Sequence, residues 1–437
     1  MRNCRACFRS GALAAAVLAA GLAAAEGPFS APEQLTGDGE RYRLARSAPG
    51  SAAFGPGGTL HLTYWSGGEV TNPSSPSHVY YRSWTHAAGW TEEVLVDSSE
   101  TPGGERVGGR NPALAVSPDG DTLIVWQDHR HCTADHAWID NIELYGRTLP
   151  AGAAEFGTET RLTETNAPHN GDNGYAPKLA LMPDGSVALV WYDFHDDRDV
   201  SDIHLQISDA DWQFDTTSPI TDHRRTDRAD RGGSLAYTLP TAAADPAGTL
   251  HLCWIGGTEG NGPVYYGTFD PETSGFVYTE VMTGGGDFFS PPHVAVGPDG
   301  VAWIVIARPV GGGTEVALLG MPEAGTEPPD VRTPFPSASS QSAPSAAFDA
   351  DGNMHVAWLE GGAVWYGLYD PAEDAALERV QVSAEAGTYR RPLALPDPEG
   401  RPHVLYEQEI GFAAGALWFA APADTTALPA GEWLQYE

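Results

Sequence analysis

Short apolar runs separated by turn sequences recur along most of the chain. In "PKLALMPDGSVALVWYDF", residues 177–194, an apolar run leads into Pro-Asp-Gly and then into a second run rich in Val, Leu and Trp. Two apolar runs of this length around a tight turn are typical of antiparallel strands. The segment therefore predicts a β-hairpin that ends in a polar stretch.

The same hairpin pattern occurs seven times. Six residues after the turn glycine of each copy stands a large residue, usually Trp or Tyr, and eight residues before it most copies have a proline. The turn glycines are Gly58, Gly120, Gly185, Gly248, Gly300, Gly352 and Gly400. A register this regular indicates an internal structural repeat.

Each hairpin is followed by a third predicted strand, and a weaker fourth strand separates the copies. The third strands begin at His78, Asn141, Asp202, Pro263, Glu315, Ala363 and Ala416, and the fourth at Glu93, Thr160, Pro219, Glu280, Val331 and Val380. The fourth strand of the seventh repeat is "EQLTG", residues 33–37, which precedes the first copy. Repeats of four strands are typical of propeller blades, which bury their faces by closing into a ring. We therefore predict an all-β, seven-bladed β-propeller of four-stranded antiparallel blades, with residues 33–37 completing the last blade.

The N-terminal segment has the features of a secretion signal. Residues 1–25 begin with arginines, continue through an Ala/Leu/Val-rich run and end in Ala-Ala-Ala, which predicts cleavage and a secreted or periplasmic protein. Residues 26–437 would then form a single propeller domain. The CxxC motif of Cys4 and Cys7 lies in the removed segment, so it does not indicate a redox or metal site. Cys132 and Cys253 fall in repeats that are not neighbours, so we expect no disulfide and a core position for Cys253.

Charge narrows the range of partners. The chain has 58 acidic and 24 basic residues, a formal net charge of −34, and a single lysine, Lys178. Such an acidic protein repels nucleic-acid phosphates and anionic membranes, so we expect no nucleic acid partner and no membrane insertion.

Polar residues concentrate in the loops of one predicted face. In an up-and-down blade, the loops between the second and third strands and between successive blades meet at the same face, and here they are long and polar in repeats two to four. Polar loops on a rigid scaffold are the usual location of binding sites. The candidate ligand-binding residues on this face are Arg110, Asp128, His129, Arg130, His169, Tyr175, Asp193, His195, Arg198, Arg231 and Arg391.

Several of these residues also have a structural interpretation. Asp128 with Arg130, and Asp193 with Arg198, are equally suited to ion pairs that hold strand ends. Metal binding is a further alternative, although no cofactor is required. The oxygen-bearing candidates for Ca²⁺ are Asp193, Asp196, Asp197 and Asp202, whose spacing is not that of an EF-hand. The cluster of His129, His131, Cys132 and His136 has zinc-ligand chemistry, but its spacing fits no zinc pattern and favours a solvated loop.

Two stretches resemble a known family. "PALAVSPDGDTLIVWQDHR" followed by "IELY", and "PKLALMPDGSVALVWYDFHDDRDVSDIHL", resemble the repeats of secreted sialidase-like, BNR-repeat propellers. The resemblance extends from about Glu33 onward. Sialidases bind the substrate carboxylate with three arginines, and the resemblance implies that such a trio would come from Arg110, Arg231, Arg308 and Arg391. The segment "YRLA" at Tyr42 matches only in part the F/Y-R-I-P sequence that opens sialidases.

Three functions are compatible with these features. The favoured one is a secreted propeller that binds an extracellular glycan or protein through its loop-rich face, because this fold is reused for many purposes. The second is a sialidase-type glycoside hydrolase, which needs a Tyr/Glu pair or two carboxyl groups about 5 to 9 Å apart at the axis. The third is a polysaccharide lyase that would use His129, His169, His195 and Tyr175 for proton transfer.

Overall fold

The computed structural model describes thirteen stretches of the chain. They are residues 28–37, 41–45, 49–67, 77–98, 108–131, 142–163, 175–194, 201–214, 237–256, 262–286, 290–322, 328–410 and 414–423. Within these stretches the chain forms strands β1 to β29 and one short 3-10 helix, Pro56–Gly58. No helix in these stretches is long and apolar enough to cross a membrane. The predicted secretion signal lies outside them.

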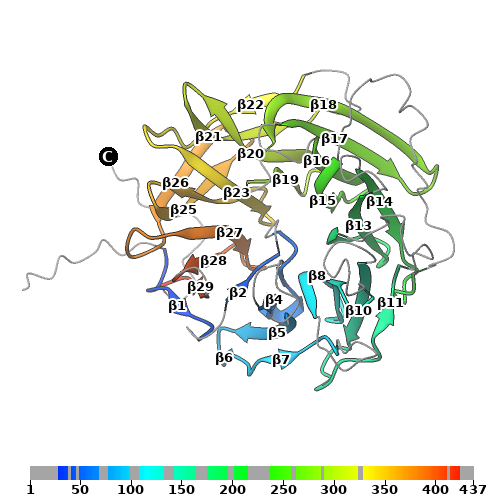
Figure 1. Cartoon of the computed structure of the whole chain (residues 1–437). Helices are drawn as coiled ribbons and strands as arrows, with labels where there is room; N and C mark the ends of the chain where they lie inside the picture. The colour runs from blue at the N-terminus through cyan, green and yellow to red at the C-terminus, as the bar shows by residue number, and fades with distance from the viewer. Residues whose placement is uncertain are drawn as a thin grey trace, which may run out of the picture.

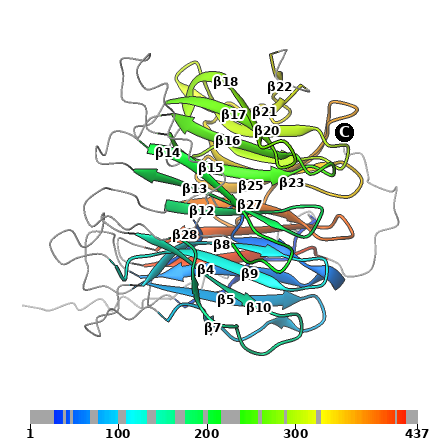
Figure 2. The ribbon, with the colours of Figure 1, turned by 90° about the vertical axis from the view of Figure 1, so that its right-hand side faces the viewer.

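The strands form seven sheets arranged around a ring (Figure 1). This confirms the predicted seven-bladed β-propeller. In the side view the strands run between the two faces of the disc (Figure 2). Four blades consist of four consecutive strands each. Blade two contains β8 (Gly109–Val116), β9 (Thr122–Asp128), β10 (Glu143–Leu149) and β11 (Thr160–Arg161), and blade four contains β15 (Tyr237–Ala244), β16 (Leu250–Gly256), β17 (Gly262–Asp270) and β18 (Gly275–Gly286). Blade five contains β19 (His293–Val296), β20 (Ala302–Val310), β21 (Gly313–Gly320) and β22 (Asp330–Arg332), and blade six contains β23 (Gln341–Phe348), β24 (Met354–Glu360), β25 (Ala363–Asp370) and β26 (Ala375–Gln381).

The other three blades depart from this pattern. In blade one, β2 (Tyr42–Arg43) and β3 (Ala52–Phe54) share the inner edge of β4 (Leu60–Ser66), while β6 (Gly89–Trp90) and β7 (Val94–Leu95) share the outer edge of β5 (His78–Thr85). Blade three contains β12 (Tyr175–Leu181), β13 (Val187–Phe194) and β14 (Ser201–Ile207), and its predicted fourth strand at Pro219 lies outside the described residues. Blade seven contains β27 (Tyr389–Pro396), β28 (Pro402–Glu409) and β29 (Gly415–Ala420), and its outer strand is β1 (Glu33–Gln34), paired antiparallel to β29. The N-terminal strand therefore joins the two ends of the chain.

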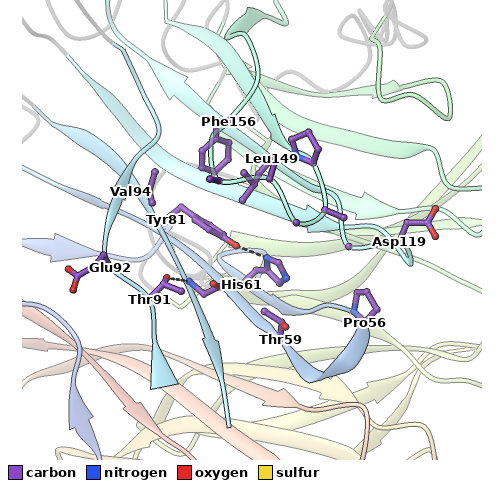
Figure 3. Close-up of a pocket in the computed structure, with 17 residues that line it drawn as sticks. Pro56, Thr59, His61, Tyr81, Thr91, Glu92, Val94, Asp119, Leu149 and Phe156 are labelled. Carbon is purple, nitrogen blue, oxygen red and sulfur yellow. Dashed lines mark hydrogen bonds between the residues drawn. The ribbon is translucent and has the colours of Figure 1, made fainter. Parts of the chain in front are cut away.

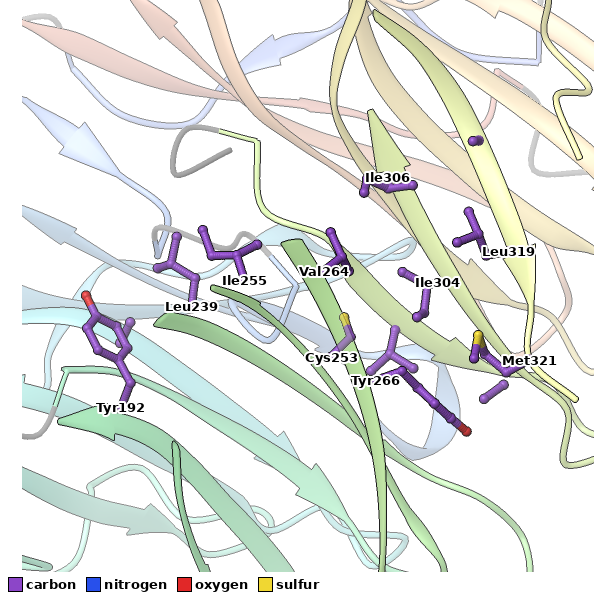
Figure 4. Packing of buried hydrophobic residues seen from close by; sticks show 14 residues of the cluster. Tyr192, Leu239, Cys253, Ile255, Val264, Tyr266, Ile304, Ile306, Leu319 and Met321 are labelled. Atoms are coloured by element: carbon purple, nitrogen blue, oxygen red, sulfur yellow. The ribbon is translucent and has the colours of Figure 1, made fainter. Parts of the chain in front are cut away.

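The apolar core is divided among the interfaces between neighbouring blades. One cluster packs Cys253 and Val264 of blade four against Ile304 and Leu319 of blade five (Figure 4). The predicted blade-core tryptophans of the second strands are buried: Trp126, Trp191, Trp254 and Trp358. Because each blade buries its apolar faces against its neighbours, closure of the ring stabilises every blade.

The inner strands share an irregularity close to the loop-rich end of the axis. The residue before the strand proline has a φ between +45° and +52° in five blades, at Asn111, Ala176, Leu239, Ala343 and Arg391. The strand register shifts at the same place in each of these blades. A residue in the left-handed region with a register shift marks a β-bulge, which redirects the neighbouring side chains. Two of the candidate arginines, Arg110 and Arg391, lie at these bulges.

Candidate functional site

Arginines from three blades meet at the loop-rich end of the axis. Arg43 is on β2, Arg110 on β8 and Arg391 on β27, and these strands surround the centre of the ring (Figure 1). The guanidinium carbons of Arg43 and Arg110 lie 5.0 and 5.7 Å from the centroid of one ring, that of Trp65. Burial, together with the charges of Arg41, Arg391 and Arg110, lowers the pKa of Arg43 to about 10, against an opposing effect of Glu407. We call Arg43, Arg110 and Arg391 the arginine cluster.

A buried carboxylate holds Arg391 in place. Nη1 of Arg391 donates to both carboxylate oxygens of Glu407, at 2.8 and 2.9 Å. Glu407 is 4% exposed and also accepts a hydrogen bond of 2.6 Å from the backbone N–H of Leu44. Because Leu44 directly follows Arg43, the same carboxylate fixes the side chain of Arg391 and the backbone next to Arg43.

A second buried carboxylate, from blade one, fixes the backbone next to Arg110. Asp97 is 2% exposed and accepts hydrogen bonds of 3.0 Å from the backbone N–H groups of Val79 and Gly109. Nε of Arg110 donates to Oγ of Ser77 at 3.0 Å. Blade one thus positions the first residues of β8 and, with them, the Arg110 side chain.

Arg43, unlike Arg41 and Arg391, has no carboxylate partner among the described residues. It is half-buried and stacks on Trp65, and among the described residues no carboxylate lies within ion-pair distance of its guanidinium. Arg41, by contrast, pairs with Glu409 at 2.9 Å. In a chain with a net charge of −34, an unneutralised and partly desolvated cation is a favourable position for an anionic group.

Asp128 lies inside blade two and holds the end of β9. Its side chain is fully buried and accepts hydrogen bonds from Trp126 Nε1 at 3.0 Å and from Arg130 Nε and Nη2 at 2.9 and 2.8 Å. Burial disfavours the charged form, but the bonds from Arg130 and Trp126 hold the pKa of Asp128 below its ordinary value. Arg130 also pairs with Glu159 at 2.6 Å.

Blade six has the same arrangement, because Trp358 Nε1 donates to Glu360 at 2.9 Å and Arg379 pairs with that carboxylate at 2.7 Å. This recurrence fits the strand-end interpretation of Asp128 and Arg130, and their role in ligand binding stays a prediction.

His129 and Tyr175 lie near the inner strands of blades two and three. His129 is 2% exposed, and its Nε2 lies 3.0 Å from the side-chain amide of Gln127. Burial and the charge of Arg110 lower the pKa of His129 to about 3, so its imidazole is neutral. The ring of Tyr175 stacks on that of Tyr192, with centroids 5.3 Å apart.

The remaining predicted residues separate into two groups. Arg308 is described and pairs with Glu315 on blade five. The residues outside the described stretches are Cys132, His136, His169, His195, Asp196, Asp197, Arg198 and Arg231, and the side chains of Asp193 and Asp202 lie outside them as well. Among described residues, no group of three His, Cys, Asp or Glu side chains could hold a metal ion, so Ca²⁺ binding stays a prediction.

Arg43 and Trp65 are the site residues that the sequence analysis missed. The available signal was "YRLA", because its second residue is Arg43. The partial match to the sialidase opening therefore identified a position that meets Arg110 and Arg391 in space.

Comparisons with known proteins bear on the fold. No family model and no curated protein matches the chain. Among solved structures, the polysaccharide lyase Uly1 aligns with a TM-score of 0.55 and 12% identity over 90% of this chain and 94% of that chain. A PL25 ulvan lyase aligns with a TM-score of 0.53 and 13% identity over 90% and 94%. The NanB sialidase of Streptococcus pneumoniae aligns with a TM-score of 0.47 and 11% identity over 91% and 71%. At these identities the likeness shows the fold alone, which this chain shares with the two lyases.

Proposed function

We propose that the protein is secreted and binds an acidic glycan through the arginine cluster. The observation that carries this proposal is Arg43, whose guanidinium, like that of Arg110, lies over the ring of Trp65 and has no carboxylate partner among the described residues. A carboxylate accepts two parallel N–H bonds from a guanidinium. The carboxylate of an acidic sugar would therefore supply the missing partner of Arg43.

A glycan suits the cluster better than other anions do. The ring of Tyr42, the residue before Arg43, is half-buried and offers an apolar surface for a sugar ring. The net charge of −34 opposes a polyanion that lies along the surface, whereas a terminal acidic sugar meets the cluster at the axis alone. Uly1 and the PL25 ulvan lyase, the structural neighbours with TM-scores of 0.55 and 0.53, are named as polysaccharide lyases. Their names support a polysaccharide as the ligand.

Binding is favoured over hydrolysis because the described carboxylates near the cluster are occupied. Glu407 accepts bonds from Arg391 and from the backbone of Leu44. Tyr64 donates to Glu93, but Tyr64 is fully buried and Glu93 lies at the outer edge of blade one. Neither group is in a position to act as a nucleophile toward a sugar at the cluster.

Calorimetric titration of the secreted protein with sialyllactose and trigalacturonate, compared with the neutral sugars lactose and maltotriose, tests this function. We expect binding of an acidic sugar and a loss of about tenfold or more in affinity for Arg43→Gln, because a charge-assisted bond contributes about 1.5–3 kcal/mol. Arg332→Gln is the matched control, since Arg332 also stacks on a tryptophan, Trp303, at 5.2 Å but pairs with Asp330. Equal affinity for acidic and neutral sugars, or unchanged binding by Arg43→Gln, would contradict the proposal. Release of cleaved sugar in the same samples would identify an enzyme.

A further inference from the structure

A buried histidine recurs in the second strand of several blades, three residues after the turn glycine. In blade four, Nδ1 of His251 lies 2.6 Å from the hydroxyl of Tyr266, and its Nε2 lies 3.3 Å from a carboxylate oxygen of Asp245. A carboxylate accepts and cannot donate, so it fixes the proton on Nε2 and leaves Nδ1 to accept from the tyrosine.

Blade six repeats this arrangement. Nδ1 of His355 lies 2.9 Å from the hydroxyl of Tyr366, and its Nε2 lies 3.2 Å from Asp349. In both blades the aspartate stands six residues before the histidine, at the start of the turn. A carboxylate is thus the partner of Nε2 in both of these blades.

Blade one keeps the histidine and the tyrosine but lacks the carboxylate. Nδ1 of His61 lies 2.8 Å from the hydroxyl of Tyr81 and 3.0 Å from that of Thr122. The residue six positions before His61 is Gly55, and a Cβ at this glycine would lie 3.0 Å from Nε2. Within the described residues, no group hydrogen-bonds to Nε2 of His61. A neutral imidazole whose Nδ1 accepts from a tyrosine hydroxyl, which Tyr81 provides here as Tyr266 and Tyr366 do in the other two blades, carries its proton on Nε2 and can donate it.

A cavity of about 540 Å³ lies beside this histidine, between blades one and two (Figure 3). His61 and Tyr81 lie at its inner end, and its wall includes Leu149 and the half-buried ring of Phe156, which meets the ring of Tyr81 edge-on at 5.5 Å. The cavity is formed by the short turns, at the face opposite the arginine cluster. Its volume is within the range of roughly 300–1,000 Å³ that is usual for ligand pockets.

We propose that this cavity is a second binding site, which takes a neutral saccharide unit whose oxygen accepts the hydrogen bond from Nε2 of His61. An aromatic ring beside a hydrogen-bond donor suits a sugar, which presents C–H groups on one face and oxygens at its edge. Two exposed carboxylates, Glu92 and Asp119, line the cavity on either side of His61 and Tyr81 (Figure 3). Carboxylates accept bonds from sugar hydroxyls and repel an acidic ligand. The second site therefore excludes the acidic sugars that the arginine cluster is proposed to bind.

Titration with methyl β-D-glucopyranoside, methyl β-D-galactopyranoside and methyl β-D-xylopyranoside, followed by saturation-transfer NMR and calorimetry, tests the second site. Gly55→Asp restores the carboxylate of the other blades, and Gly55→Ala is the matched control. Both add a Cβ that meets Val116 at 2.9 Å and Nε2 of His61 at 3.0 Å, so both require the same shift, and the backbone at Gly55, with φ −96° and ψ −176°, accepts either residue. We expect Gly55→Asp to bind about tenfold or more weakly than Gly55→Ala, because only the aspartate accepts the hydrogen bond from Nε2.

Phe156→Ala, at a half-buried position, tests the site independently of the turn and is expected to lose about tenfold through the missing ring contact. Arg43→Gln should bind these glycosides normally, which separates the second site from the arginine cluster. The proposal is overturned if none of the three glycosides binds the wild type, if the two Gly55 variants lose affinity equally, if Phe156→Ala binds normally, or if Arg43→Gln abolishes binding.

Discussion

The side-chain ammonium group of Lys178 donates a hydrogen bond of 2.9 Å to the backbone carbonyl of Pro49, which links blade three to blade one past the inner strand of blade two. Lys178 is the only lysine in the chain, and it is 3% exposed. Burial, with a smaller effect from the charge of Arg391, lowers its pKa to about 7. The centre of the ring therefore contains an amine that loses its proton near neutral pH.

This relationship predicts a pH-dependent stability that Lys178→Met removes. The pKa of Lys178 is about 7 in the folded chain and about 10.4 in the unfolded chain. Between these values the unfolded state binds more protons, so the free energy of unfolding rises with pH, by up to about 1.4 kcal/mol per pH unit from this group. Below pH 7 both states are protonated and the slope disappears. Urea unfolding at pH 7, 8 and 9 should show this increase of the free energy of unfolding with pH in the wild type and not in Lys178→Met. If the free energy of unfolding changes equally with pH in the two proteins, the lowered pKa of Lys178 is refuted.

Asp128→Asn is expected to destabilise the fold and to leave glycan affinity unchanged. The carboxylate of Asp128 is fully buried and is bonded to Trp126 and Arg130. Breaking a buried ion pair costs about 3 kcal/mol or more. Glu360→Gln, which breaks the same arrangement in blade six, provides a parallel measurement. Thermal melting and calorimetry on both variants distinguish a structural role at the strand end from a role in ligand binding. Lost glycan affinity at normal stability would assign Asp128 to the binding site.

The blades were predictable from the sequence because their signals are local. Period-two apolar runs and turn glycines fix each hairpin, and glycines such as Gly120 and Gly185 do have positive φ, at 96° and 88°. The bulges before the prolines were not predictable in the same way. The residue before a proline normally stays extended, whereas Ala343 and Leu239 adopt the left-handed region. Tertiary contacts between inner strands override the local preference there.

The arginine cluster shows why the site was only partly predicted. Arg110 and Arg391 were candidates because they lie near the ends of strands that face the loop-rich side. Arg43 lies on β2, a strand of only two residues, which leaves almost no periodic pattern to read. Its proximity to Arg391 depends on closure of the ring between blades one and seven, so no local pattern reports it.

Cys253 should resist thiol reagents in the native protein and react after unfolding. It is fully buried between blades four and five, and burial raises the pKa of its thiol to about 12. A thiol must ionise and meet the reagent before it reacts. Iodoacetamide labelling is measured in a Cys132→Ser background, so that the signal of Cys253 is separated from that of Cys132, which lies outside the described residues. Native labelling at the rate of an exposed thiol would contradict the core position.

Removal of residues 33–37 is expected to open the ring at its seam. Glu33 and Gln34 pair with Phe419 and Trp418, and the backbone N–H of Leu35 donates to Leu417 at 2.8 Å. Without this strand, β29 presents an unpaired edge, which promotes aggregation.

A single substitution, Leu35→Ala, tests the same seam without removing the strand. The side chain of Leu35 is 8% exposed and packs in the cluster shared by blades seven and one, so Leu35→Ala should cost about 2 kcal/mol or more in the free energy of unfolding. Removal of residues 432–437, at the other end of the chain and outside the described residues, is the control and should leave the melting temperature unchanged. Melting curves and light scattering on the three variants decide between the two ends of the chain. If the C-terminal truncation melts early and the N-terminal deletion behaves as the intact protein, the ring is closed by the C-terminus and the role assigned to β1 is wrong.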